Sequence, residues 1–128
     1  MIKPTVIVSR LWPEQVERYM TEVFEVQLNP DDVAMTGDEM LAALKSCDAF
    51  CPTVTDAVNA DVLGVGNAQA KIIGSNGVGF NHIDLDAANA AGFCVTNTPD
   101  VLTDCTADIA MNLLLTVARR TGEGERHV

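Results

Sequence analysis

The sequence has no apolar run long enough to cross a bilayer. A membrane-spanning helix needs about 20 consecutive, mainly apolar residues, and the longest apolar stretch, near residues 109–118, is interrupted by Asn112 and Thr116. The N-terminus also lacks the charged segment and apolar core of a secretory signal. We therefore expect a soluble, cytoplasmic protein that has no membrane as a partner.

Positive charge is scarce. Eight lysines and arginines stand against 18 aspartates and glutamates, so the formal net charge is -10. The phosphates of nucleic acids would be repelled by most of such a surface, as would the headgroups of an anionic membrane. The charge balance argues against a nucleic-acid partner.

The four cysteines, Cys47, Cys51, Cys94 and Cys105, show no paired C-x-x-C spacing. They lie within apolar segments, where cysteine behaves as a small hydrophobe. We expect reduced thiols in the core and no metal site.

A third glycine is missing from the glycine-rich turn GSNGVGFNHID at residues 74–84. The dinucleotide fingerprint G-x-G-x-x-G requires it for close packing of a helix on its strand, but His82 stands there. No acidic residue ends a second strand about 20 residues later, as the fingerprint also demands. The turn is therefore assigned another role.

The 128 residues, 48% of them apolar, are enough for one domain with a core of its own. Short β-branched or apolar runs alternate with helical patterns along the chain. Strands are expected at residues 5–9, 24–28, 48–54, 71–74 and 93–96. Helices are expected after Pro13, after a capping box at residues 36–39, over residues 59–65, after a cap at Asp84, and from a cap at Thr103 to Arg119, Arg120 and Gly122.

Such alternation is typical of an α/β fold with a parallel sheet covered on both faces. We predict a flavodoxin-like, five-stranded sheet in the order 2-1-3-4-5, followed by a long C-terminal helix. Ligands of these sheets bind outside the carboxyl ends of the strands. The turn at Gly77, Val78 and Gly79 is expected there.

Residues 71–120 resemble the D-isomer-specific 2-hydroxyacid dehydrogenases, above all the glyoxylate and hydroxypyruvate reductase branch. The resemblance rests on the glycine turn with its N-x-I-D step, on V-T-N-T-P, on V-L-T-D-x-T-A-D at a helix start, and on A-R-R at its end. The segment TVTDAV at residues 53–58 resembles the family's loop after the third strand. Residues 1–50 agree with the family only in pattern.

The resemblance implies a substrate clamp. In the family, the N–H groups matching Val78 and Gly79 bind the carboxylate of a 2-oxo acid, which suits a turn of consecutive N–H donors. Thr53 and Val54 match the loop that walls the substrate. Asn76 and Gly77 differ from the bulkier residues of many relatives, which leaves the choice of 2-oxo acid open. The alternative is a tight turn beside a plain strand end.

Thr106 matches a position that touches the bound dinucleotide in relatives; its alternative role is a capping residue at the third position of the helix. The catalytic histidine of the family, its acidic partner and its catalytic arginine lie beyond this chain. Neither His82 nor His127 is therefore assigned to catalysis, and no catalytic residue is predicted.

The expected organisation is a substrate domain over residues 1–99 and a long inter-domain or dimerisation helix with a truncated end over residues 100–128. The nucleotide-binding domain would then be absent, and NAD or NADP would bind only in a longer parent protein. The predicted function is reduction of a small 2-oxo acid by that parent, with this chain inactive alone. The alternative is a complete, non-enzymatic binding or dimerisation module.

The helix expected at residues 103–120 carries two apolar stripes, one with Met111, Leu114 and Leu115 and one with Ile109 and Leu113. A helix that is apolar on two faces must be buried on both. We expect one face to cover the sheet and the other to form a symmetric homodimer or a domain-swapped pair.

Overall fold

The computed structural model of the chain describes residues 2–124 and 126. Five parallel strands form one sheet in the order β2-β1-β3-β4-β5, which confirms the predicted fold and order. The strands are β1 (Thr5–Val8), β2 (Glu25–Gln27), β3 (Ala49–Cys51), β4 (Ile72–Gly74) and β5 (Cys94–Thr96). The helices are α1 (Glu14–Val23), α2 (Gly37–Ser46), α3 (Ala60–Leu63), α4 (Leu85–Ala90), α5 (Thr103–Arg119) and α6 (Thr121–Gly124).

Side-chain caps start three of these helices, and the sequence predicts two of the caps, at Thr36 and Asp84. The Thr36 hydroxyl accepts from the Glu39 N–H, and the Glu39 carboxylate accepts from the Thr36 N–H at 2.7 Å, which completes the capping box of α2. Asn59 Oδ1 caps α3, and Asp84 Oδ1 accepts from the Ala87 N–H at 2.9 Å to cap α4. Each cap satisfies an N–H group that has no partner within its helix.

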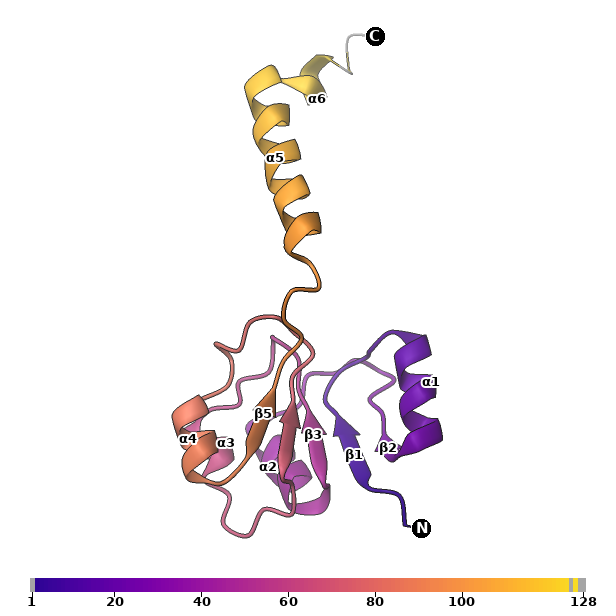
Figure 1. Cartoon of the computed structure of the whole chain (residues 1–128), viewed down its shortest axis with the longest axis vertical. Coiled ribbons are helices and arrows are strands. Elements are labelled where there is room, and N and C mark those ends of the chain that lie inside the picture. Colours follow the sequence, from indigo (N-terminus) through magenta and orange to yellow (C-terminus); the bar gives the residue numbers. More distant parts are fainter. Residues whose placement is uncertain (1, 125, 127–128) are drawn as a thin grey trace.

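Helices lie on both faces of the sheet (Figure 1). Strand β1 contributes side chains to the core on each face. Successive side chains of a strand point to opposite faces. Ile7 belongs to the larger core cluster with residues of α2, α3 and α4. Val6 and Val8 pack instead with Met20 of α1 and with Cys51. From β1 the chain adds β2 on one side of the sheet, and it then adds β3, β4 and β5 on the other side. Because β-α-β crossovers are right-handed, this change of side places the connecting helices on both faces.

The strands are shorter than the apolar runs predict, most clearly in β3, which ends at Cys51 rather than near Val54. Pro52 has no N–H to donate to a neighbouring strand. The Thr53 N–H donates to the Asp56 carboxylate at 2.7 Å, so the chain turns there. Residues 53–56 thus form a loop at the carboxyl end of the sheet.

Helix α5 contradicts two predictions about its ends. The residue before its first turn is Leu102, which makes no side-chain cap, so Thr103 lies inside the helix and does not cap it. The helix ends at Arg119, and Arg120 rather than Gly122 closes it in the left-handed conformation, with φ 52°.

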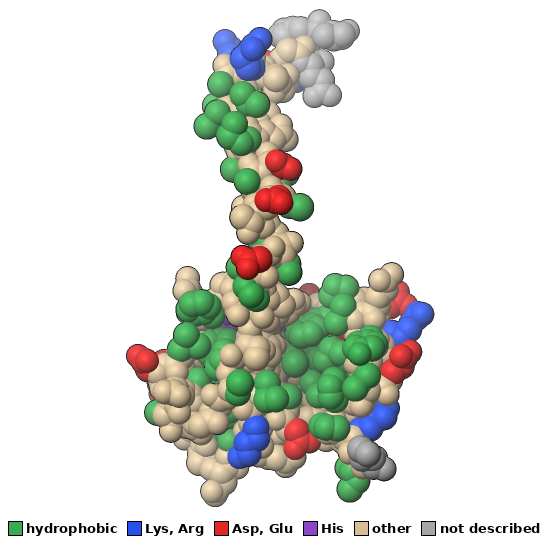
Figure 2. All heavy atoms as spheres, in the orientation of Figure 1, with side chains coloured by type: hydrophobic (Ala, Val, Ile, Leu, Met, Phe, Trp, Pro, Cys, Tyr) green, Lys and Arg blue, Asp and Glu red, His purple; other side chains and the backbone are tan. Residues whose placement is uncertain are grey.

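The prediction that one face of α5 covers the sheet is also wrong. The helix extends away from the sheet and has no buried residue (Figure 1). Its large apolar side chains are exposed, from 53% for Leu115 to 78% for Val117. Figure 2 shows apolar side chains along this helix and a second apolar area over the sheet below it. The apolar pattern correctly marked a helix, but the sheet of this domain does not supply the covering surface.

Among the described residues, no helix is both long and apolar enough to cross a membrane.

Candidate functional site

The loops that follow β3 and β4 lie side by side at the carboxyl end of the sheet. Thr53 and Asn76 pair as an isolated parallel bridge just beyond these strands. The Asn76 N–H donates to the Pro52 carbonyl at 2.9 Å. Five residues of the predicted clamp accompany Thr53 in this region, namely Val54, Asn76, Gly77, Val78 and Gly79.

The turn after β4 presents free N–H groups on one side. Within the described part of the chain, the amides of Gly77, Val78 and Gly79 donate no hydrogen bond. The Gly77 carbonyl accepts from the Thr98 N–H at 2.9 Å, and the Val78 carbonyl accepts from Asn97 Nδ2 at 2.8 Å.

These two carbonyl contacts set the direction of the free amides. In a trans peptide, the N–H points opposite to the C=O of the same unit, and no described peptide bond is cis. The N–H groups of Val78 and Gly79 therefore point away from residues 97–98. Such a pair of adjacent donors is suited to bind an anion.

The two glycines of the turn differ in what surrounds them. A Cβ atom on Gly77 would lie 2.5 Å from Cγ1 of Val54, whereas a Cβ on Gly79 would meet no atom within 4 Å. Neither glycine adopts the left-handed conformation. Gly77 is thus required for close packing of the two loops, whereas the space beside the Cα of Gly79 is open.

Asp56 joins the end of β1 to the loop after β3. The residue is only 3% exposed. Its carboxylate accepts from the Ser9 hydroxyl at 2.5 Å and from the Thr53 N–H at 2.7 Å. Hydrogen bonds to a buried carboxylate are stronger than neutral ones. They fix Thr53 beside Asn76. The sequence pattern of residues 53–58 did not predict this role of Asp56.

Arg10 is a second residue that sequence reasoning missed. Its guanidinium pairs with Asp32 at 2.9 Å and donates to the Thr55 hydroxyl at 3.1 Å. The hydrogen bond from Arg10 lowers the pKa of the Asp32 carboxyl, with a further contribution from the Leu11 N–H. The signal in the sequence that could have identified Arg10 is a cationic residue directly after a buried strand. The contact places positive charge beside the loop of residues 53–56.

His82 lies at the far end of the turn and is hydrogen-bonded to Ser75, with 3.0 Å between Nε2 and Oγ. Burial lowers the pKa of His82, while the negative charge of Asp56 opposes that shift. The ring is therefore held toward its neutral form. His127, the other histidine, lies outside the described residues.

The prediction of four core thiols is half correct. Cys47 and Cys51 are buried, but Cys94 and Cys105 are exposed. Burial raises the pKa of both Cys47 and Cys51 to about 11. Cys94 lies in the edge strand β5, and Cys105 lies in α5, where no other element covers it. Residues 2–124 and 126 contain no cluster of potential metal ligands.

Thr106 stands apart from the other predicted site residues. It is exposed in the second turn of α5, and its N–H donates to the Leu102 carbonyl at 2.9 Å. Because α5 begins at Thr103, Thr106 is the fourth residue of the helix, so its alternative role as a capping residue at the third position is wrong. The chain carries G-x-G sequences at residues 64–66, 77–79 and 122–124, and each lacks the third glycine of the dinucleotide fingerprint.

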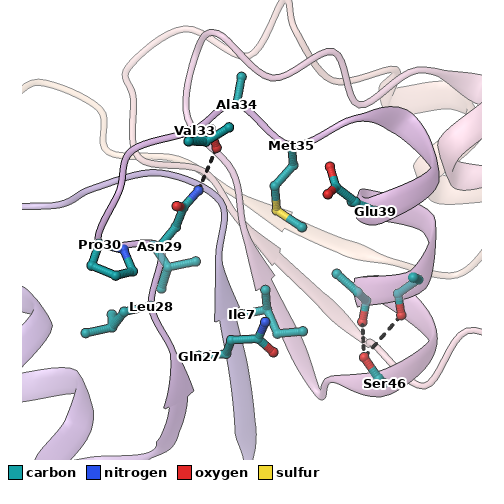
Figure 3. A pocket seen from close by; sticks show the side chains of 13 residues that line it. Ile7, Gln27, Leu28, Asn29, Pro30, Val33, Ala34, Met35, Glu39 and Ser46 are labelled. Atoms are coloured by element: carbon teal, nitrogen blue, oxygen red, sulfur yellow. Dashed lines mark hydrogen bonds between the residues drawn. The ribbon is translucent and has the colours of Figure 1, made fainter.

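Two hollows lie near the ends of the strands. One, of about 360 Å³, is bordered by Val54, Asp56, Asn81 and His82, and so adjoins the turn. The other, of about 400 Å³, lies between α2 and the loop after β2 (Figure 3). Its walls are mainly aliphatic. On the side opposite α2, the Asn29 side chain donates to the Val33 carbonyl at 2.7 Å within the loop after β2 (Figure 3). None of the predicted site residues lines this second pocket.

The chain is similar to proteins whose names describe 2-hydroxyacid chemistry. It is 40% identical over 128 residues to a glyoxylate reductase of Thermococcus litoralis, covering 99% of this chain and 38% of that protein. It is 38% identical to a glycerate dehydrogenase of Hyphomicrobium methylovorum, covering 100% of this chain and 40% of that protein. The chain thus spans well under half the length of these relatives.

A solved structure supports the same relationship. The holo D-mandelate dehydrogenase of Rhodotorula graminis superimposes with a TM-score of 0.76 at 25% identity, covering 98% of this chain and 40% of that one. The family described as D-isomer specific 2-hydroxyacid dehydrogenase, catalytic domain, matches residues 5–121. Together with the shared fold, this match shows that the chain belongs to the D-isomer-specific 2-hydroxyacid dehydrogenases.

Proposed function

We propose that this chain is the substrate domain of an NAD(P)-dependent dehydrogenase that reduces a small 2-oxo acid such as glyoxylate or hydroxypyruvate. The observation that carries the proposal is the pair of free, similarly directed N–H groups at Val78 and Gly79. They would bind the substrate carboxylate. The printed names of the relatives, glyoxylate reductase and glycerate dehydrogenase, supply the class of acid.

The remaining predicted residues have distinct parts in this proposal. Thr53 and Val54 would wall the substrate, since the Thr53–Asn76 bridge places their loop against the turn. Gly77 allows that close approach, and Asn76 lines the same edge. Arg10 and the buried Asp56 would hold the wall in place through Thr55 and Thr53.

The dinucleotide would bind to a part of the parent protein outside this chain, and it would supply the hydride. Of the residues described here, Thr106 alone is proposed to contact it. The chain by itself is therefore expected to show no protein-dependent oxidation of NAD(P)H in the presence of glyoxylate.

A titration with oxalate, observed through backbone amide chemical shifts, tests the binding proposal. Two backbone donors in a protein of net charge -10 support millimolar affinity at best, on the order of 4 kcal/mol. The amides of Val78 and Gly79 should show the largest shifts. Largest shifts elsewhere, for example at the pocket beside α2, would refute the carboxylate clamp.

The second proposed property is self-association through residues 103–120, in the soluble and cytoplasmic protein expected from the sequence. The exposed apolar side chains of α5 carry this proposal (Figure 2). An apolar surface of that extent is unusual for a soluble monomer. A symmetric homodimer, or a pair exchanging this helix, would cover it. The same property would suit the alternative of a non-enzymatic dimerisation module.

A further inference from the structure

The loop that carries the free amides is closed by a side-chain hydrogen bond between its two ends. Ser75 follows β4 directly, and His82 lies two residues before the cap of α4. Ser75 Oγ and His82 Nε2 are 3.0 Å apart. Ser75 is only 4% exposed, so its hydroxyl has little access to water as a substitute partner.

Both partners are held by the backbone of neighbouring elements. The Ser75 N–H donates to the Thr96 carbonyl at 2.9 Å, and the His82 carbonyl accepts from the Val58 N–H at 2.9 Å. The side-chain bond therefore joins two anchored points. Residues 76–81 span the interval between them and include Gly77, Val78 and Gly79.

The bond also lies close to the turn itself. Ser75 Oγ is 3.9 Å from the position that a Cβ of Gly77 would occupy. The imidazole of His82 is thus separated from the turn by a single hydroxyl group. Asp56 and Asp84 are the carboxylates beside His82 at the neighbouring hollow.

We propose that Ser75 and His82 are a positioning pair that holds the β4–α4 turn in the conformation in which the Val78 and Gly79 amides point the same way. Neither side chain binds the ligand; both act through the turn. The inference deepens the proposed function and rests on it only for the identity of the ligand. A preorganised pair of donors binds more tightly than a mobile one, because less order must be imposed on binding.

Amide relaxation measurements on the ligand-free, full-length chain test the pair directly. Ser75→Ala and His82→Phe should each lower the order parameters of Val78 and Gly79 from about 0.85, typical of a rigid backbone, to about 0.6 or less. The double variant should cause no further drop, because the two changes remove one and the same contact. If the two changes instead caused a general loss of packing, the drops in the order parameters would be additive in the double variant.

Conservative and remote variants serve as controls. Ser75→Thr and His82→Gln retain polar groups for the contact and should preserve order in the turn. Ser46→Ala removes a hydroxyl that bonds only to carbonyls of α2, and should leave the turn unchanged. If Ser75→Ala does not fold, His82→Asn, which shortens the side chain but keeps it polar, takes its place as the disruptive change.

Oxalate titrations of the same variants separate this inference from the proposed function. Affinity should fall about tenfold in Ser75→Ala and in His82→Phe, and by no more in the double variant. Failure of oxalate to shift Val78 and Gly79 in the unaltered chain would overturn the carboxylate clamp alone. Unchanged order parameters in folded Ser75→Ala and His82→Phe would overturn the positioning pair, whatever oxalate does.

Discussion

Gly77 and Val54 are packed so closely that a Cβ on Gly77 would lie 2.5 Å from Cγ1 of Val54, while Gly79 has open space around its Cα. The two glycines should therefore respond differently to alanine. Gly77→Ala forces the loops apart and should lower the free energy of unfolding by about 1–2 kcal/mol. Urea denaturation measures this loss.

Gly79→Ala should leave the free energy of unfolding nearly unchanged, because the added methyl group would meet no atom within 4 Å. The same variant should weaken oxalate binding, because the methyl group would stand next to the free amides. Adding Val54→Ala to Gly77→Ala should restore stability by removing the clash. Equal stabilities of the two single alanine variants would contradict this assignment.

Asp56 should be the carboxylate on which the loop of residues 53–56, the proposed substrate wall, depends most. Asp56→Ala leaves the Ser9 hydroxyl and the Thr53 N–H without their acceptor and should cost about 3 kcal/mol of stability. Asp31→Ala, at an exposed aspartate, is the matched control and should cost less than about 0.5 kcal/mol. Comparable losses for the two variants would exclude a special role for Asp56.

The four thiols should separate into two classes on reaction with a thiol reagent. Cys94 and Cys105 are exposed and should be modified rapidly in the native chain. Cys47 and Cys51 are buried with pKa values of about 11, so they should react only after unfolding. Mass spectrometry after brief labelling at neutral pH identifies the sites. Early labelling of Cys47 or Cys51 would mean that the core opens readily.

Stability should depend on the ionisation of His82. Burial lowers the pKa of His82 in the folded chain below its value in the unfolded chain, so the unfolded state binds the proton more readily. The contribution of His82 is fully present above its unfolded pKa of about 6.5 and is lost as the pH falls through the folded pKa.

His82→Gln should therefore flatten the decline in stability below about pH 6.5. The difference between its unfolding curves and those of the unaltered chain isolates this group from the carboxylates. Parallel pH profiles for the two proteins would contradict the assignment.

Leu113 is 60% exposed on α5 and should lie in the proposed contact between two copies. The unaltered chain should sediment as a dimer at micromolar concentration. Leu113→Asp places a charge in that apolar contact and should shift the chain to monomer or aggregate. Glu123→Gln, in α6, is a control that should leave the sedimentation unchanged. A well-behaved monomer for the unaltered chain, with α5 ordered, would disprove self-association.

Local chemistry made much of the fold predictable. The Thr36 and Asp84 caps and the β-branched run of β1 act over a few residues, and the sequence displays them directly. The bond between Ser9 and Asp56 joins residues 47 positions apart, and the pair of Arg10 and Asp32 joins residues 22 positions apart. No local pattern encodes such contacts.

The course of α5 was unpredictable for another reason. Its two apolar stripes require burial, but the pattern does not say whether the cover comes from the sheet, from the rest of a longer protein or from a second copy. The same limit applies to Cys105, whose apolar neighbours suggested a core position that the helix does not have.

The residues that orient the turn are also the residues through which the chain leaves the sheet. Asn97 and Thr98 donate hydrogen bonds to the carbonyls of Val78 and Gly77, respectively. From Pro99 the chain continues toward α5. Residues 99–102 then lead to α5, so the segment that aims the amide donors also joins the sheet to that helix. A change in the orientation of α5 that displaced residues 97–98 would therefore also change the direction of the two amide donors.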